Sequence, residues 1–200
     1  MRRANVRIRP AEREDVDGLA ALTQSIDTSS GTFSGRGLIK PDLDHLITRF
    51  DEILDEDSRF MLVACDEQSG EVVGLLLARR EEIGAIDVTP ALHISHLLVM
   101  PNHRRRGIGA ALLVAAVHLA EEQGVDRVLA TVSSASRDAN RYLSRLGFAP
   151  LVIQRVASTG VLRRALGLMD EPQRVAMLRR ARLTRAQRAR PATQVVDRGA

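Results

Sequence analysis

Cysteine is nearly absent from the chain, because Cys65 is the single cysteine among 200 residues. One cysteine excludes a disulfide within the chain and a cysteine metal cluster, and the sequence predicts no metal site. Such sparse use of cysteine is typical of a cytoplasmic protein, which is the location that we expect. Since Cys65 lies among apolar residues of an expected strand, we interpret it as a core residue rather than a nucleophile.

Long apolar runs are missing as well. No stretch is as long as a membrane span, and no apolar segment follows Met1-Arg2-Arg3. The sequence therefore predicts neither a membrane helix nor a signal peptide.

Negative charge and aromatic residues are scarce at the C-terminal end. From Arg155 onward the chain has eleven arginines and three acidic residues, a balance of +8, so residues 1–154 carry −4 of the total +4. Residues 174–190 have the pattern of a basic helix, which can touch RNA or an acidic partner. Because this segment lacks aromatic residues on which bases stack, we favour a packing or dimer-edge helix over nucleic-acid binding. The sequence leaves the formation of a homodimer as an open alternative.

The most informative stretch runs from Leu97 to Leu113. An apolar strand ends at Pro101, three arginines follow, and a helix with apolar residues at spacings of three and four begins beside Gly107 and Gly109. Unpaired backbone N–H groups at a helix N-terminus, together with the helix dipole, bind anions. The third glycine and later acidic residue of a dinucleotide fingerprint are absent, and no Gly-Lys-Ser/Thr of a P-loop follows. We therefore predict a phosphate or pyrophosphate site of another kind.

Strands and helices are expected in a mixed order along the chain. We predict strands at 5–9, 59–66, 71–80, 92–99, 127–132 and 150–156, helices at 15–24, 41–54, 107–123, 136–146 and 161–168, and polar loops at 25–39 and 81–90. The late strand–helix–strand order implies a parallel pair or a splay beside the central strand. We expect one α/β domain over 1–157 and an arginine-rich extension over 158–200, helical to about residue 190 and then disordered.

The pattern Arg104-x-x-Gly107-x-Gly109, which follows a strand ending in Val99, resembles the coenzyme A motif of the GNAT superfamily of N-acetyltransferases. A second family-like segment ends in Leu146-Gly147-Phe148. The resemblance covers residues 5–157. It implies a GNAT-like mixed central sheet flanked by helices, in a single domain with a basic helical extension.

The resemblance also implies where acetyl-CoA, the acetyl donor, would bind. The backbone of Leu97, Leu98 and Val99 would face the pantetheine arm, and Arg104 occupies the first position of the motif. The other implied contacts are backbone groups of the turn and two polar residues further along the chain: Arg105, Arg106, Gly107, Ile108, Gly109, Ala110, Ser136 and Asn140.

His93 falls where many GNAT enzymes place a general base on the central strand, and an imidazole changes charge near neutral pH. Strand alternation predicts that His93, Ser95 and Leu97 share one face, while His96 lies on the opposite face with Ile94 and Leu98. Either histidine can instead be an ordinary hydrogen-bonded strand residue. The rival bases or amine anchors are Glu81, Glu82 and Asp87 in the preceding loop.

The family often has a tyrosine that protonates the leaving thiolate, five residues before the phenylalanine of the Gly-Phe pair. That position is Leu143 here, and Tyr142 is one residue earlier, about 100° away around the helix. Tyr142 is a candidate general acid only if the helix shifts, and packing is its alternative role.

These features together predict an N-acetyltransferase that moves an acetyl group from acetyl-CoA to a primary amine by direct attack on the thioester. The amine acceptor is unidentified and is either a small molecule or a protein. Two alternatives stay open. One is a coenzyme A-binding sensory module without catalysis, and the other is a protein- or RNA-directed acetyltransferase guided by residues 174–190.

Overall fold

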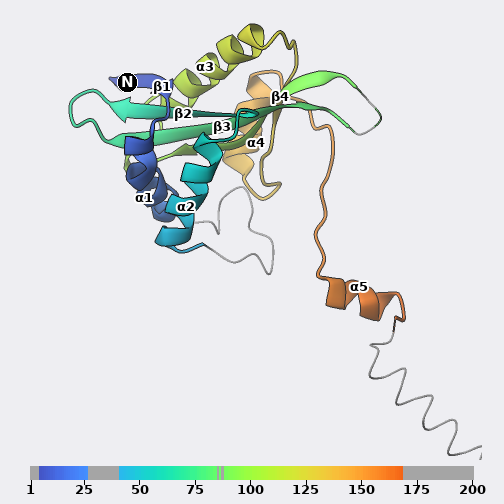
Figure 1. The fold of residues 1–200 in the computed structure, drawn as a ribbon. Coiled ribbons are helices and arrows are strands. Elements are labelled where there is room, and N and C mark those ends of the chain that lie inside the picture. Colours follow the sequence, from blue (N-terminus) through green and yellow to red (C-terminus); the bar gives the residue numbers. More distant parts are fainter. Residues whose placement is uncertain (1–4, 27–40, 85, 87, 169–200) are drawn as a thin grey trace, which may run out of the picture. The chain divides into compact units, whose positions relative to one another are not determined.

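The computed structural model describes residues 5–26, 41–84, 86 and 88–168 (Figure 1). The chain divides into two compact units, Met1–Leu151 and Val152–Ala200. Most of the loop expected at 25–39, the acidic residue Asp87 and the basic helix expected at 174–190 lie outside the described residues.

The first unit is built on one mixed sheet. Its strands are β1 (Val6–Pro10), β2 (Arg59–Asp66), β3 (Val72–Glu82), β4 (Pro90–Val99) and β5 (Val128–Ala130), and they lie side by side in that order. The first three pairs are antiparallel, and β4 and β5 are parallel. A parallel pair needs a crossover connection, which the chain supplies as a helix between these two strands. The predicted mixed sheet, with a parallel pair beside the central strand, is confirmed.

Helices cover both faces of this sheet. On one face lie α1 (Val16–Ser25) and α2 (Leu43–Leu54), and on the other lies α3 (Ile108–Glu122), as Figure 1 shows. The α1/α2 side has its own buried cluster, which includes Leu22, Phe50 and Leu75, and the α3 side has a second one around Leu76 and Leu112. Because alternate residues of β3 enter opposite clusters, its continuous apolar run is buried on both faces.

An ion pair between a partly buried arginine and a buried aspartate lies at the start of α1. The Arg9 guanidinium donates to both carboxylate oxygens of Asp15, at 2.6 and 2.8 Å. The backbone N–H of Glu12 also donates to Asp15, at 2.8 Å. These bonds compensate the desolvation of a charged group that the fold buries. Cys65 is buried as well, which raises the pKa of its thiol and confirms the core assignment.

Two expected boundaries differ from those observed. The loop expected at 81–90 is shorter, since β3 runs to Glu82 and pairs with the start of β4, and Ile83 N–H donates to Thr89 C=O at 3.1 Å. The strand expected at 150–156 does not form, and residues 148–158 adopt neither helix nor strand. An apolar run alone does not make a strand, which needs a neighbouring strand for its hydrogen bonds.

The remaining helices are α4 (Arg137–Arg145) and α5 (Thr159–Ala165). The helix expected at 161–168 begins two residues earlier as α5, where the Ser158 hydroxyl accepts from Val161 N–H at 3.3 Å. This is an ordinary serine cap, which satisfies one of the orphan donors of a first helical turn. No helix in the described part of the chain is long and apolar enough to cross a membrane.

Candidate active site

The turn between β4 and α3 exposes backbone N–H groups in a fixed arrangement. Arg105 has φ of 60° and Gly107 has φ of 88°, so both lie in the left-handed region. The first helical hydrogen bond of α3 runs from Ala111 N–H to Gly107 C=O, at 3.0 Å. The N–H groups of residues 108–110 precede this bond and therefore have no acceptor within the helix. Together with the helix dipole they make a site for a negatively charged group.

The two glycines of this turn leave space that the protein itself does not fill. A Cβ atom built at Gly107 meets no heavy atom within 4 Å, and one built at Gly109 meets only Val99 Cγ2, at 3.9 Å. Neither glycine is therefore required by packing inside the protein. The open space allows a ligand to approach the helix backbone closely, as a pyrophosphate group requires.

The three arginines of the turn have different surroundings. Arg104 Nε donates to the carbonyl of Val99 at 3.2 Å, so this side chain ties the turn to the end of β4. The Arg105 guanidinium lies 3.8 Å from Asp138 of α4, and both side chains are exposed. Arg106 is also exposed. Arg105 and Arg106 thus add positive charge beside the opening of α3.

Strands β4 and β5 separate just beyond Ile94. Their pairing joins Leu92 to Val128 and Ile94 to Ala130, and a last bond runs from Thr131 N–H to Ile94 C=O at 3.0 Å. Beyond this bond the edge of β4 has no strand partner on that side within the described residues. The backbone of Leu97, Leu98 and Val99, expected to face the pantetheine arm, lies along this open edge.

A bulge at Ser95 changes which side chains share a face. His96 pairs with Leu77 but Ile94 pairs with Ala78, so Ser95 is an extra residue that has no opposite on β3. Leu92 and Ile94 pack in the α3-side cluster, and after the bulge Leu97 and Val99 pack against the same cluster. The expected opposition of the two histidines is therefore wrong. His93 and His96 both lie on the α1/α2 face, since one inserted residue reverses the alternation.

His93 lies between two polar partners at the point where the strands separate. Its Nδ1 is 2.7 Å from Glu81 Oε1, and its Nε2 is 2.6 Å from Thr131 Oγ1. The Nδ1 atom is buried, and its contact with the Glu81 oxygen does not have the geometry of a hydrogen bond, so the two groups interact through close electrostatic contact. The second carboxylate oxygen of Glu81 lies 2.5 Å from the guanidinium of Arg79. A connected row of Arg79, Glu81, His93 and Thr131 thus runs from β3 across β4 to the residue that follows β5.

His96 has a different environment from His93. Burial, followed by electrostatic interaction with His93 and Arg59, lowers the pKa of His96 below its usual value. Its Nδ1 lies 3.1 Å from the hydroxyl of Ser95. His96 is therefore neutral near pH 7.

The other predicted site residues lie on or beside α4. Asn140 Nδ2 donates to the carbonyls of Ser133 and Ser136, at 2.8 and 2.7 Å, and so closes the loop before α4. The Tyr142 ring packs against the α3-side cluster, and Leu143 is half-buried. The coenzyme A contacts of Ser136 and Asn140, and the acid role of Tyr142, stay predictions.

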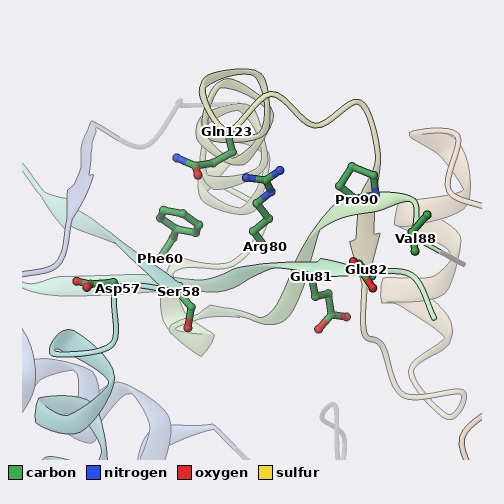
Figure 2. A pocket seen from close by; sticks show the side chains of 9 residues that line it. All are labelled: Asp57, Ser58, Phe60, Arg80, Glu81, Glu82, Val88, Pro90 and Gln123. Atoms are coloured by element: carbon green, nitrogen blue, oxygen red, sulfur yellow. The ribbon is translucent and has the colours of Figure 1, made fainter. Parts of the chain in front are cut away.

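A surface groove of about 550 Å³ lies near the far end of α3 from the glycine turn. Figure 2 shows Phe60 and Arg80 beneath Gln123, while Glu81 points to the other side of β3. The 15 residues of α3 separate this groove from the turn by about 22 Å along the helix. The groove is therefore distinct from the turn.

The sheet, the open edge of β4 and the glycine turn belong to one α/β domain, and the N–H groups and exposed arginines of the turn suit a phosphate-bearing ligand. The model of the acetyltransferase (GNAT) family matches residues 27–148. This match covers more than half of the chain, which therefore belongs to the GNAT acetyltransferase family.

Solved structures with the same fold support this assignment. A transcriptional regulator from Bacillus halodurans C-125 has a TM-score of 0.63 at 22% identity, with 76% of this chain and 99% of the other covered. An aminoglycoside acetyltransferase from an uncultured soil metagenomic sample gives 0.58 at 21%, covering 77% and 96%. Glucosamine-6-phosphate N-acetyltransferase from Arabidopsis thaliana gives 0.57 at 18%, covering 77% and 98%. No curated protein sequence matches.

Membership in this family makes the chain an acyltransferase whose acetyl donor is acetyl-CoA. The residues of the turn fit this donor, because free N–H groups, unfilled space at Gly107 and Gly109, and exposed arginines suit a pyrophosphate. An aminoglycoside N-acetyltransferase of the same fold binds CoA, with a TM-score of 0.59 at 18% identity.

Proposed function

We propose that this acyltransferase transfers the acetyl group to a primary amine, with His93 as the general base. The observation that carries the proposal is the position of His93, 18% exposed, where β4 and β5 separate. Acetyl-CoA supplies an activated thioester, whose carbonyl carbon bonds to the amine nitrogen as the thiol leaves. An amine is protonated at neutral pH, so it must lose a proton before it can attack.

The chain's own residues support this role for His93. Glu81 lies at one ring nitrogen and the Thr131 hydroxyl at the other, so the ring is held in one orientation. The amine can replace the Thr131 hydroxyl as the partner of His93 Nε2. Because the ring is already oriented, little of its rotational freedom remains to be lost when the amine binds.

The leaving thiolate needs a proton, and here the chain departs from the usual family pattern. Leu143 occupies the position of the family tyrosine, and the neighbouring Tyr142 packs against the core. We propose that the thiolate takes the proton that the attacking nitrogen releases. Tyr142 as the acid remains the second candidate.

The acceptor class is proposed from the relatives of the same fold. Their names describe acetylation of aminoglycosides and of glucosamine-6-phosphate, whose acceptors are amino sugars. We therefore place amino sugars first in a panel of acceptors that also includes polyamines and peptide N-termini. The polar side chains in contact with His93 are Glu81, near the end of β3, and Thr131.

A free-thiol assay over this panel tests the proposal. We expect thiol release with at least one amine, and His93→Ala should lower kcat/KM by about 100-fold or more, the usual contribution of a general base. His118→Ala, at an exposed position of α3, is the matched control and should leave the rate unchanged. Full activity of His93→Ala would contradict the assignment of the base.

Leu143 also favours a second candidate, a sensory module that binds coenzyme A without catalysis. The same assay separates the two functions. Binding of acetyl-CoA without thiol release on any amine would support the sensory module.

A further inference from the structure

We propose that Glu81 is a positioning residue, which fixes the tautomer of His93 so that Nε2 accepts the proton. The inference rests on the proposed function and adds to it a residue from a neighbouring strand. Its second part is that the Glu81 carboxylate stabilises the imidazolium that His93 becomes.

Strand pairing brings the carboxylate to the ring. Arg79 lies opposite His93 in the ladder between β3 and β4, and Glu81 lies opposite Ala91. Because residues two apart share a face of a strand, Arg79 and Glu81 lie on the His93 side of the sheet. Glu81 is thus a diagonal neighbour of His93, a distance that long side chains span. The observed separation of 2.7 Å between Oε1 and Nδ1 agrees with this placement.

The chemistry of the two partners then assigns the proton on the ring. A carboxylate oxygen repels the lone pair of an imidazole nitrogen, so the buried Nδ1, 2.7 Å from Glu81 Oε1, carries the hydrogen although the contact lacks hydrogen-bond geometry. The neutral ring therefore keeps its lone pair on Nε2, and the Thr131 hydroxyl donates to it at 2.6 Å. The Arg79 guanidinium lies 2.5 Å from the other oxygen of Glu81 and forms an ion pair with it.

Transfer of a proton from the substrate turns Nε2 from an acceptor into a donor. One N–H bond of the substrate ammonium breaks, a new N–H bond forms at Nε2, and the positive charge moves to the ring. The Nδ1–H contact with Glu81 then becomes a charge-assisted pair. The proton returns to solvent after the acetyl transfer. Among the described residues, the other charged or titratable groups near this part of the sheet include Arg79, His96 and Arg59, whose guanidinium pairs with Glu56.

The tautomer can be measured without any turnover. Long-range 15N–1H NMR spectra of the full chain distinguish Nδ1–H from Nε2–H imidazole, and the His93 signal is identified by its loss in His93→Ala. We expect the Nδ1–H form in the wild type and a change toward Nε2–H in Glu81→Ala. Glu82→Ala, one residue along on the other side of the strand, should leave the His93 signal unchanged. An Nε2–H signal in the wild type would overturn the inference.

Kinetics test the second part with an isosteric pair of variants. Glu81→Gln removes the charge, so we expect the plateau of kcat/KM to fall about 10-fold or more. The melting temperature should hardly change, because partly exposed ion pairs contribute little to stability. Glu82→Gln is the control and should match the wild type.

The outcomes separate this inference from the proposed function. If His93→Ala inactivates the enzyme while Glu81→Gln keeps the full rate and Glu81→Ala keeps the Nδ1–H tautomer, the role of Glu81 is wrong and the base assignment stands. If His93→Ala keeps full activity, the base assignment fails, and the NMR measurement still decides whether Glu81 sets the tautomer.

Discussion

Replacing Gly74 by alanine should destabilise the protein, because α3 packs directly on this residue. A Cβ atom at Gly74 would lie 3.1 Å from Ile108 Cγ2 and 3.2 Å from both Ala64 Cβ and Leu112 Cδ1. All three neighbours are at most 1% exposed, so none can move into solvent. Ordinary contacts between carbon atoms are about 3.5–4.0 Å. The helix, the neighbouring strand or both must therefore shift.

The size of the effect follows from two opposing contributions. Overpacking a well-filled core costs about 1–3 kcal/mol. Replacing a glycine reduces the entropy of the unfolded chain, which returns about 0.4–1 kcal/mol. We expect a net loss of about 1–2 kcal/mol in the free energy of unfolding, measured in urea, and a fall in melting temperature of about 2–8 °C.

Two further variants make this test specific. Ala64 is the cross-strand partner of Gly74, so Ala64→Gly in the Gly74→Ala background removes one of the close contacts and should recover part of the loss. Gly160→Ala places the same methyl group in α5, where it meets no heavy atom within 4 Å, and should not destabilise. A Gly74→Ala protein as stable as the wild type would refute the argument.

Three other substitutions test the site and the ion pair at the start of α1. Gly109→Asp should raise the Kd for acetyl-CoA about 10-fold or more in calorimetry, although an acidic residue in a first turn stabilises a helix by about 0.3–1 kcal/mol. Val117→Asp, exposed and about 12 Å further along α3, is its control and should keep the affinity. Asp15→Asn should cost about 1–3 kcal/mol at pH 7 by urea unfolding. Burial raises the pKa of Asp15, but the hydrogen bonds from Arg9 and the Glu12 N–H lower it further, so the net shift is downward. The carboxylate therefore stabilises the fold above its unfolded pKa of about 3.9, and the difference between variant and wild type should vanish as the pH falls through the lower folded value. Tyr142→Phe should change kcat by less than about twofold, whereas the loss of a true general acid costs about 100-fold or more.

Local patterns in the sequence were sufficient to predict the turn and its helix. Pro101 ends the apolar strand, the glycines mark the turn, and apolar residues at helical spacing continue from Ile108. Each of these signals depends on residues within a few positions of one another. The structure has the expected elements there, with β4 ending at Val99 and α3 beginning at Ile108.

The neighbours of His93 could not be predicted in the same way. The bulge at Ser95 and the pairing of β3 with β4 depend on register between strands, which local patterns do not specify. Glu81 was therefore expected in a loop, as one of several rival bases, rather than beside the His93 ring. Thr131 was missed altogether, because nothing in its own sequence context shows that it faces His93 from β5's end.

Calorimetric titration of the full chain with acetyl-CoA tests the central claim most directly. The account predicts saturable binding with one site per chain, weakened by Gly109→Asp and unaffected by Val117→Asp. Absence of binding by folded wild-type protein would contradict the assignment of the turn at residues 104–110 as the acetyl-CoA site.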